Sequence, residues 1–287
     1  MKYIPIRKIN GYSKEPDFLG GFSIRDLQDL LGGKDLVHEL HRHDFFFILA
    51  VRKGLGIHEI DFIPYNVHDN AVFMLRPGQV HKLELKKDCA GFLLEFAPTF
   101  YHPNETLSKQ RLSRAVNKGF CTVEPARFKK LLAVLRGIFH EFTAKQEGYL
   151  EMIRANLDIF FIEFIRQHKS RDANPKNTGA HAQDRFEDFL EQLEMNIASL
   201  KRVSQYANLL NLSAYQLNAI TREKVGKPAS ALINERIILE AKRYLLATTN
   251  QVKEIADHLG YEDMSYFIRF FKKHAGLSPE AFRKNLQ

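Results

Sequence analysis

Two stretches of the C-terminal third share one design about 50 residues apart, and this repeat constrains the fold more than any other feature. Residues 203–226 and 252–276 each contain a short helical pattern with a small residue, Ala207 or Ala256, then a turn, then a longer helical pattern that ends at glycine. A small residue lets two helices approach closely across the three- or four-residue turn of a helix-turn-helix. The sequence therefore predicts two such motifs, the first at 203–226 and the second at 252–276.

The longer helix of each motif has recognisable ends. Ser213, with Gln216 three residues later, forms the pattern of a capping box, and Asp263 occupies the equivalent N-cap position. Gly226 and Gly276 suit the left-handed conformation that ends many helices. Both longer helices are therefore expected to be short and sharply bounded.

Each longer helix also has two faces. The apolar side chains predicted to pack inward are Leu217, Ile220 and Val225 in the first motif and Phe267, Phe270 and Phe271 in the second. The outer faces carry polar, aromatic and basic side chains, which are the kinds that meet base edges and phosphates in a major groove. A helix predicted at 229–248 would hold the two motifs about one DNA turn, ~34 Å, apart.

The positive charge of the chain is concentrated in this region. The whole chain has 42 Lys and Arg against 34 Asp and Glu, a net charge of +8. Residues 195–287 hold 14 basic and 8 acidic residues, so they contribute most of that excess. A basic excess favours an anionic partner, and its position favours double-stranded DNA. The alternative is a helical interaction module with a basic face, which would bind DNA weakly and without sequence preference.

The second motif resembles the signature of the AraC/XylS family of bacterial transcription regulators. The matching positions are Ile255, Ala256, Leu259, Gly260, Tyr261, Asp263, Ser265, Phe267, Arg269, Phe271, Lys272, Lys273, Gly276, Ser278, Pro279, Phe282 and Arg283. The resemblance covers roughly the last 100 residues, including Arg236, Ala241, Leu245 and Leu246 between the motifs. It implies a transcription regulator that inserts two helices into successive major grooves. It also implies that the regulator is an activator and works with RNA polymerase.

Carried over by position, the resemblance assigns two sets of DNA contacts. The implied base-reading residues are Tyr215, Asn218, Ala219, Ser265, Tyr266 and Arg269, and the implied phosphate contacts are Arg222, Lys272 and Lys273. The first motif departs from the family: Ala219 stands where Arg is common, Thr221 where Phe is common, and residues 226–229 read Gly-Lys-Pro-Ala in place of Gly-x-Ser-Pro. Ala219 offers only a methyl contact, so specificity is expected to lean on the second motif.

The region before residue 102 has a different texture, with short alternating or apolar runs between glycines and prolines. Such runs at 45–51, 56–62, 71–75, 82–85 and 91–96 predict an antiparallel barrel or sandwich. His41-x-His43, followed by Pro-Gly-x-x-His81, resembles the outline of a cupin barrel, in which three histidines meet at one end. Phe47 stands where a metal-binding cupin has its ligand Glu, so no metal or cofactor is expected.

The residues His41, His43, Phe47 and His81 are therefore interpreted as the contacts of a small-molecule effector or as structural residues of the barrel. Phenylalanines in these runs would give an apolar cavity with a few polar groups, although they suit a plain core equally well. Two alternatives stay open: a metal-dependent cupin enzyme fused to a DNA-binding tail, and a regulator that responds to no effector. The favoured interpretation is a regulator with a small-molecule effector and no enzymatic activity.

Apolar residues three and four apart predict two helices, about 125–146 and 149–167. They resemble the dimerisation helices of the same family, and the alternative is that they close the core of the barrel. The polar stretch 168–183 predicts a linker. The predicted α+β organisation is thus a cupin-like barrel at 1–102, a helical dimerisation segment at 103–167, the linker, and an all-helical DNA-binding domain at 184–287.

Composition excludes several other classes of protein. Only two cysteines occur, too few for a disulfide framework or a cysteine-rich zinc site. No uncharged apolar run approaches the ~18 residues of a membrane helix, and charges interrupt the N-terminal residues. We therefore expect a cytoplasmic protein with no membrane contact, and the resemblance of the two helices to the dimerisation helices of the family implies a homodimer.

Overall fold

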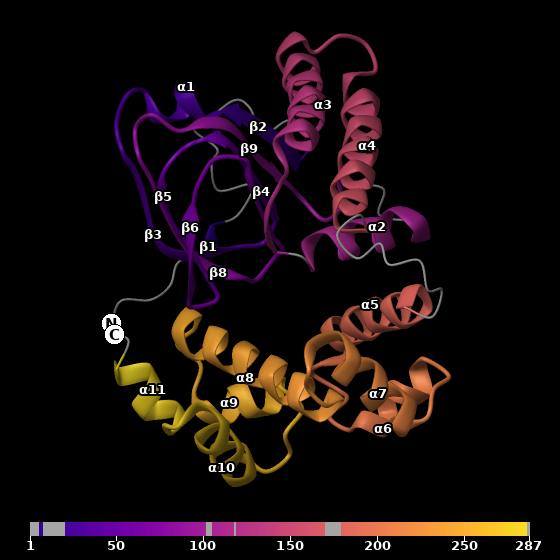
Figure 1. Cartoon of the computed structure of the whole chain (residues 1–287). Helices are drawn as coiled ribbons and strands as arrows, with labels where there is room; N and C mark the ends of the chain where they lie inside the picture. The colour runs from indigo at the N-terminus through magenta and orange to yellow at the C-terminus, as the bar shows by residue number, and fades with distance from the viewer. Residues whose placement is uncertain (1–5, 8–20, 102–104, 118, 170–178, 286–287) are drawn as a thin grey trace. The chain divides into compact units, whose positions relative to one another are not determined.

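The computed structural model of the protein describes residues 6–7, 21–101, 105–117, 119–169 and 179–285. The chain divides into two compact units between residues 173 and 174. Among the described residues, all strands belong to the N-terminal unit, and the C-terminal unit contains helices alone (Figure 1). The predicted α+β class, with strands first and an all-helical end, is confirmed.

Two sheets form the barrel of the N-terminal unit, and each has five strands in the described part of the chain. Sheet A has the order β1 (Ile6–Arg7), β3 (Leu36–His43), β8 (Val80–Leu85), β5 (Gly56–Ile60) and β6 (Ile63–Val67). Sheet B has the order β10 (Phe120–Thr122), β7 (Ala71–Leu75), β4 (Phe46–Lys53), β9 (Ala90–Phe96) and β2 (Phe22–Asp26). Nearly all neighbours pair antiparallel, the exception being β1 with β3.

Both faces of sheet B are buried, which explains why its strands are so apolar. Successive side chains of a strand point to opposite faces. Along β4, Phe47, Leu49 and Val51 pack into a core that also contains Leu83 and Leu85 of sheet A. Ile48 and Ala50 belong instead to a second core that is shared with helices. Sheet B therefore lies between the barrel interior and a helical layer.

The helical layer consists of α2 (Thr106–Val116), α3 (Pro125–Ala144) and α4 (Tyr149–Lys169), while the short α1 (Leu27–Leu31) follows β2. Helices α3 and α4 lie side by side against the barrel (Figure 1). Their apolar stripes, including Phe128, Leu135, Phe160 and Phe164, are buried in one core with sheet B. These stripes pack into the core of their own unit. This agrees with the alternative in which the two helices close the core of the barrel.

Two sequence-based boundaries need correction in this unit, and several elements are additional to those predicted. The barrel does not end at residue 102, because β10 pairs with β7 from beyond that point. The run predicted as a strand to Phe62 ends at Ile60, since Asp61 and Phe62 have positive φ values of 50° and 69° and form the turn between β5 and β6. Strands β2, β3 and β6 and helices α1 and α2 were not predicted from the periodicity at all.

The predicted linker 168–183 is shortened at both ends by helix. Helix α4 continues to Lys169, and α5 (Gly179–Asn196) begins five residues before the predicted helical domain at 184. Residues 170–178 lie outside the described part of the chain. The division between the two compact units falls within this predicted linker.

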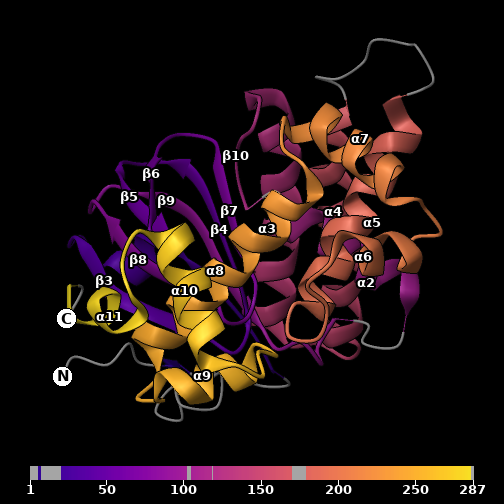
Figure 2. The ribbon, with the colours of Figure 1, turned by 90° about the horizontal axis from the view of Figure 1, so that it is seen from below.

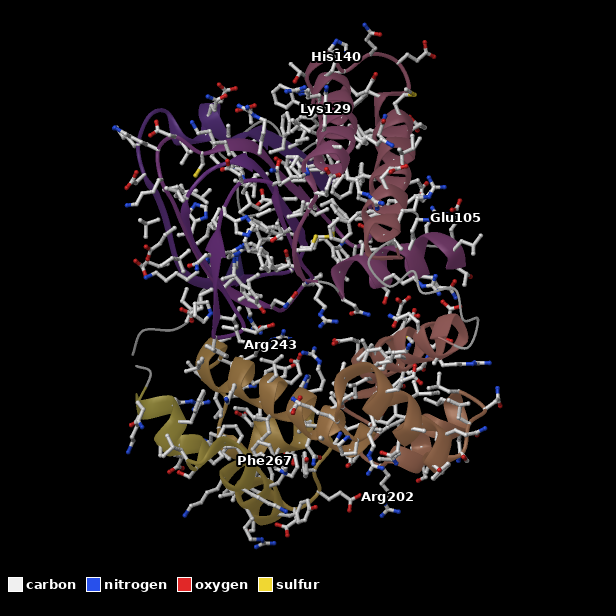
Figure 3. All side chains as sticks on the ribbon, in the orientation of Figure 1. Glu105, Lys129, His140, Arg202, Arg243 and Phe267 are labelled. Carbon is white, nitrogen blue, oxygen red and sulfur yellow. The ribbon has the colours of Figure 1, made fainter. Side chains whose placement is uncertain are left out.

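Six further helices complete the C-terminal unit: α6 (Val203–Leu209), α7 (Ala214–Val225), α8 (Ala229–Ala247), α9 (Val252–His258), α10 (Met264–Ala275) and α11 (Pro279–Asn285). Helix α8 runs through the unit, with α6 and α7 toward one end and α9 and α10 toward the other (Figure 2). Its buried residues Ile233, Ile237, Ala241 and Leu245 share one core with both motifs. Phe267 of α10 lies inside this core (Figure 3).

No helix in the described ranges is both long enough and apolar enough to cross a membrane.

Candidate DNA interface and barrel histidine cluster

The first predicted motif is α6 and α7, joined by a tight turn. Ala207 is buried where α6 meets α7, and Asn211 takes the left-handed conformation, with a φ of 54°, within the turn. The Ser213 hydroxyl accepts a hydrogen bond from the Gln216 amide at 3.1 Å, and the Gln216 side chain accepts one from the Ser213 amide at 2.8 Å. The predicted capping box is therefore present, and Gly226 ends the helix with a φ of 71°.

The second motif is α9 and α10, and it repeats this construction. Ala256 is buried, and Gly260 takes the left-handed conformation at the position of Asn211. The Asp263 carboxylate caps α10 by accepting from the Ser265 amide at 2.7 Å, and Gly276 ends the helix with a φ of 80°. Both longer helices thus begin and end at the residues that the sequence indicated.

One of the residues predicted to pack into the cores of the two motifs lies at the surface instead. Leu217, Phe267 and Phe271 are fully buried, and Ile220 and Phe270 are partly buried against the same core. Val225 was predicted to pack inward, but 43% of its surface is exposed, because it lies in the last turn just before Gly226. Thr221, which replaces the family's Phe, is buried and donates its hydroxyl to the Asn218 carbonyl at 3.2 Å.

The outer faces of α7 and α10 expose most of the side chains that were assigned to DNA. Tyr215 is 84% exposed. Ala219, Ser265, Tyr266 and Arg269 are also exposed. Arg269 approaches Asp263 at 3.9 Å, an exposed ion pair that holds the guanidinium only weakly. These side chains are therefore open to solvent on the outer faces of the two helices.

Asn218 is placed differently from the other assigned base-reading residues. Its amide oxygen accepts from the Ala229 amide at 3.0 Å, and its amide nitrogen donates to the Ala214 carbonyl at 2.9 Å. The side chain is half-buried and joins α7 to the start of α8. The structure therefore gives Asn218 a capping role that the sequence did not indicate.

The assigned phosphate contacts lie toward the ends of the same helices. Arg222 is exposed in the last turn of α7, and Lys272 and Lys273 are exposed in the last turn of α10. Positive side chains at a helix C-terminus are also favoured by the helix dipole, so their position has a structural benefit besides any contact with DNA.

A loop after α5 ties the second motif to the rest of the C-terminal unit. A Cβ atom at Gly260 would lie 1.9 Å from the Ala198 carbonyl oxygen, so this glycine is required by close backbone contact as well as by its φ of 73°. The Lys201 ammonium lies 5.6 Å from the centre of the Tyr261 ring, and burial lowers the pKa of Lys201 to about 8. The turn of the second motif is therefore fixed against α5 and its following loop.

In the barrel, the three predicted histidines come together in the interior. His41 on β3 lies directly opposite His81 on β8, and His43 follows two residues later on the same face. The three ring centres are 4.3 to 4.7 Å apart, and all three side chains are buried. A register shift in β3 between His38 and His41 marks a bulge, which turns His41 and His43 inward.

A fourth buried histidine joins them. His58 on β5 makes a 2.8 Å hydrogen bond between its Nε2 atom and His81 Nδ1, and His81 Nε2 lies 3.1 Å from His43 Nε2. His58 lies outside the spaced His-x-His and Pro-Gly-x-x-His pattern, so that pattern did not predict it. The alternation of Gly56, His58 and Ile60 along one strand was the signal that could have found it.

Aromatic rings enclose this cluster, and Phe47 is among them. The Phe47 ring centre is 5.1 Å from that of His81 and 5.4 Å from that of His43. Phe45 stacks on His43 with the ring centres 4.2 Å apart, and Phe73 lies 4.8 Å from His58. The cluster is therefore a group of buried polar side chains surrounded by apolar ones.

The burial of the cluster has an electrostatic consequence. Burial, with a smaller contribution from His41, lowers the pKa of His58 to about 3. Burial and the neighbouring imidazoles also hold the pKa of His81 well below its ordinary value. Both rings are therefore neutral at physiological pH, with a nitrogen lone pair on each.

Comparison with known families assigns both halves of the chain. A helix-turn-helix domain family matches residues 206–285, which include most of both motifs. The AraC-like ligand binding domain family matches residues 32–157, which include the barrel histidines and helices α2 and α3.

Two curated relatives span most of the chain. The HTH-type transcriptional activator RhaR of Yersinia pseudotuberculosis is 20% identical over 249 residues, covering 85% of this chain and 84% of its own. The HTH-type transcriptional activator RhaS of Pectobacterium atrosepticum is 23% identical over 258 residues, covering 85% of this chain and 86% of its own.

Among solved structures, ToxT of Vibrio cholerae with bound unsaturated fatty acid is 16% identical, with a TM-score of 0.40, covering 92% of this chain and 95% of its own. The C-terminal domain of the response regulator yesN from Fusobacterium nucleatum is 27% identical, with a TM-score of 0.33, covering 35% of this chain and 98% of its own.

Proposed function

This chain belongs to the AraC/XylS family of DNA-binding transcription regulators, and we propose that α7 and α10 are the two helices with which it reads DNA. The observation that carries this proposal is the repeated pair of capped helices on one connecting helix, each with an exposed polar face. Recognition helices of this kind enter the major groove, and two of them about one DNA turn apart can occupy successive grooves on one side of the duplex.

The proposed base contacts are Tyr215 and Ala219 from α7 and Ser265, Tyr266 and Arg269 from α10. Arg269 is the strongest of these, because an arginine can donate two hydrogen bonds to the O6 and N7 atoms of guanine. Arg222, Lys272 and Lys273 are the proposed phosphate contacts, which position the helices without reading sequence. Asn218 is left out of the reading set, since its amide oxygen caps α8.

Selection of binding sites from random double-stranded DNA tests this proposal. The full chain is expected to enrich one sequence with two conserved blocks, at an affinity several orders of magnitude above that for random DNA. Binding without enrichment, with an affinity that only follows salt concentration, would instead identify a basic interaction module.

We further propose that the barrel binds a small-molecule effector near His41, His43, Phe47 and His81. The match to a ligand-binding domain family over residues 32–157 supports this, as does a buried polar cluster within an apolar interior. The relatives are named activators, so we propose that this chain activates transcription, with RNA polymerase as its protein partner. The proposed location is the cytoplasm, where bacterial DNA lies. Both named relatives are regulators, and regulation without turnover of a substrate is proposed here.

The proposed homodimer uses the outer face of α4. The inner stripes of α3 and α4 are buried, but Met152 and Ile159 are 49% and 48% exposed and flank the exposed Ala155 at helical spacing. An apolar stripe on a surface helix favours contact with another helix. Met152→Asp with Ile159→Asp is expected to yield monomer by sedimentation at micromolar concentration, while Thr122→Asp on β10 leaves the dimer intact. A dimer that survives the double substitution would show that another face is used.

A further inference from the structure

The N-terminal unit contains a group of buried histidines that have no part in the proposed DNA binding. His41, His43 and His81 each offer one imidazole nitrogen, and these atoms all lie within 4.8 Å of one another. In the described ranges this is the one group of three or more His, Cys, Asp or Glu side chains near enough to share an ion. We propose that these three histidines bind one divalent transition-metal ion through their Nε2 atoms, with a small anion as the fourth ligand.

The neighbouring hydrogen bonds leave the Nε2 atoms to face the ion. His41 Nδ1 is 2.6 Å from the Glu39 carbonyl oxygen, and a carbonyl can only accept, so the proton of that ring sits on Nδ1. The Nε2 atom of His41 therefore carries the lone pair. A metal-binding histidine in proteins usually donates its second nitrogen to a carbonyl or another acceptor in this way.

His58 provides the same support to His81. Its Nε2 atom is 2.8 Å from His81 Nδ1, so His81 can donate there while its own Nε2 faces His43. His58 is thus a positioning residue and not a ligand. Because it lies on a different strand from His81, it fixes the rotation of the His81 ring from the side.

The separation of the ligand atoms fits a small ion. Zinc–nitrogen bonds of about 2.0–2.1 Å at tetrahedral angles place two nitrogens about 3.3 Å apart. His43 Nε2 and His81 Nε2 are 3.1 Å apart, and one nitrogen from each of His41, His43 and His81 can be chosen so that all three lie within 4.8 Å of one another. Small rotations of the rings would complete the arrangement. Imidazole ligands favour zinc, nickel, copper or iron over magnesium or calcium.

The surroundings indicate what the fourth ligand must be. Phe47 supplies no charge, and Glu95, which lies opposite Phe47 in sheet B, pairs with Arg25 at 2.6 Å. Three neutral imidazoles leave the ion's two positive charges uncompensated in a buried site, which is unfavourable without an anion. A carboxylate or similar oxygen donor of a small molecule would supply it. The inference rests on the barrel being the proposed ligand site, and it names the class of ligand.

Metal binding to the full chain, without DNA, tests the inference. Protein stripped with a chelator and dialysed against Zn²⁺ is expected to hold about one ion per chain by elemental analysis. Replacement by Co²⁺ should give the visible absorption of a four-coordinate site, and added acetate or a larger carboxylate should shift that spectrum.

Three variants complete the design. His43→Asn and His81→Asn should each weaken Zn²⁺ binding by more than about 100-fold, and His58→Gln by about 10- to 100-fold at unchanged stoichiometry. His140→Asn is the matched control, because His140 is exposed on α3 (Figure 3) and should bind no differently from the native chain. If the His43→Asn and His81→Asn variants fail to fold, the Co²⁺ spectrum of the native chain and the His58→Gln affinity still decide.

Two results would overturn the inference. One is a chain that retains well under one ion with every transition metal tried. The other is native-like binding in the His43→Asn and His81→Asn variants, which would locate the ion elsewhere. Operator affinity measured on the same samples separates this outcome from failure of the proposed function, since DNA binding would then persist without metal.

Discussion

The two helix-turn-helix motifs share a backbone design but differ in what they offer to DNA. With an offset of 50 residues, Ala219 corresponds to Arg269 and Arg222 to Lys272. The outer face of α10 therefore carries a side chain that can pair with guanine where α7 carries a methyl group. The comparison teaches that a duplicated fold can keep both helices in place while their outer faces differ in the side chains they present, and we propose that α10 makes most of the sequence-specific contacts.

The same offset explains the different roles of two further residues. Asn218 corresponds to Ile268, which is partly buried against the core, so this position faces inward in both motifs. In the first motif the inward side chain is polar, and it is used to cap α8. In the proposed interface, α7 therefore reads bases with Tyr215 and Ala219 alone.

The largest predicted effect is at Arg269. Arg269→Ala is expected to weaken binding to the selected site by about 10- to 100-fold, because a bidentate contact with guanine contributes ~1–3 kcal/mol. Base preference should relax in one block of the site only. A fluorescence anisotropy titration measures both effects, and Arg136→Ala on α3 is the matched control because its arginine is exposed in the N-terminal unit. An unchanged base preference in the variant would break the comparison between the motifs.

The next prediction makes the motifs more alike. Ala219→Arg adds to α7 the side chain that α10 has at Arg269, and it should increase affinity by about 5- to 10-fold for sites with guanine at one position of the other block. Repeating the site selection with this variant locates the new preference. If the added arginine changes binding equally for every sequence, it contacts phosphate and α7 does not present this position to bases.

The smallest effect is expected at Asn218, and on stability instead of specificity. Asn218→Ala removes the acceptor of the Ala229 amide and should lower the free energy of unfolding by about 1 kcal/mol. Urea unfolding of the full chain measures this, with Asn208→Ala as the control because Asn208 is exposed on α6. Should the variant keep its stability but lose base preference, Asn218 reads DNA after all.

More of the C-terminal unit than of the barrel could be predicted from the sequence, because helix signals are local and strand pairing is not. Helix caps are local, so Ser213, Gln216, Asp263 and Gly276 were all recognisable from short spacings. Barrel strands depend on partners far away in the chain, so β10 joins β7 from nearly 50 residues later and could not be found from its own three residues.

The sites follow the same division. The placement of His41 opposite His81 depends on a bulge in β3 that no local pattern indicates, and His58 becomes part of the cluster only through the register of β5 with β8. Conversely, the offset between the motifs was visible in the sequence, and aligning Asn218 with Ile268 would have shown that Asn218 faces inward.

The central claim is that two helices of one chain read two neighbouring major grooves, and hydroxyl-radical footprinting on the selected site tests it most directly. The account predicts two protected segments about one helical turn, roughly 10 base pairs, apart for each bound chain, with Arg269→Ala weakening protection in one of them. Protection of a single segment, or of none, would contradict it.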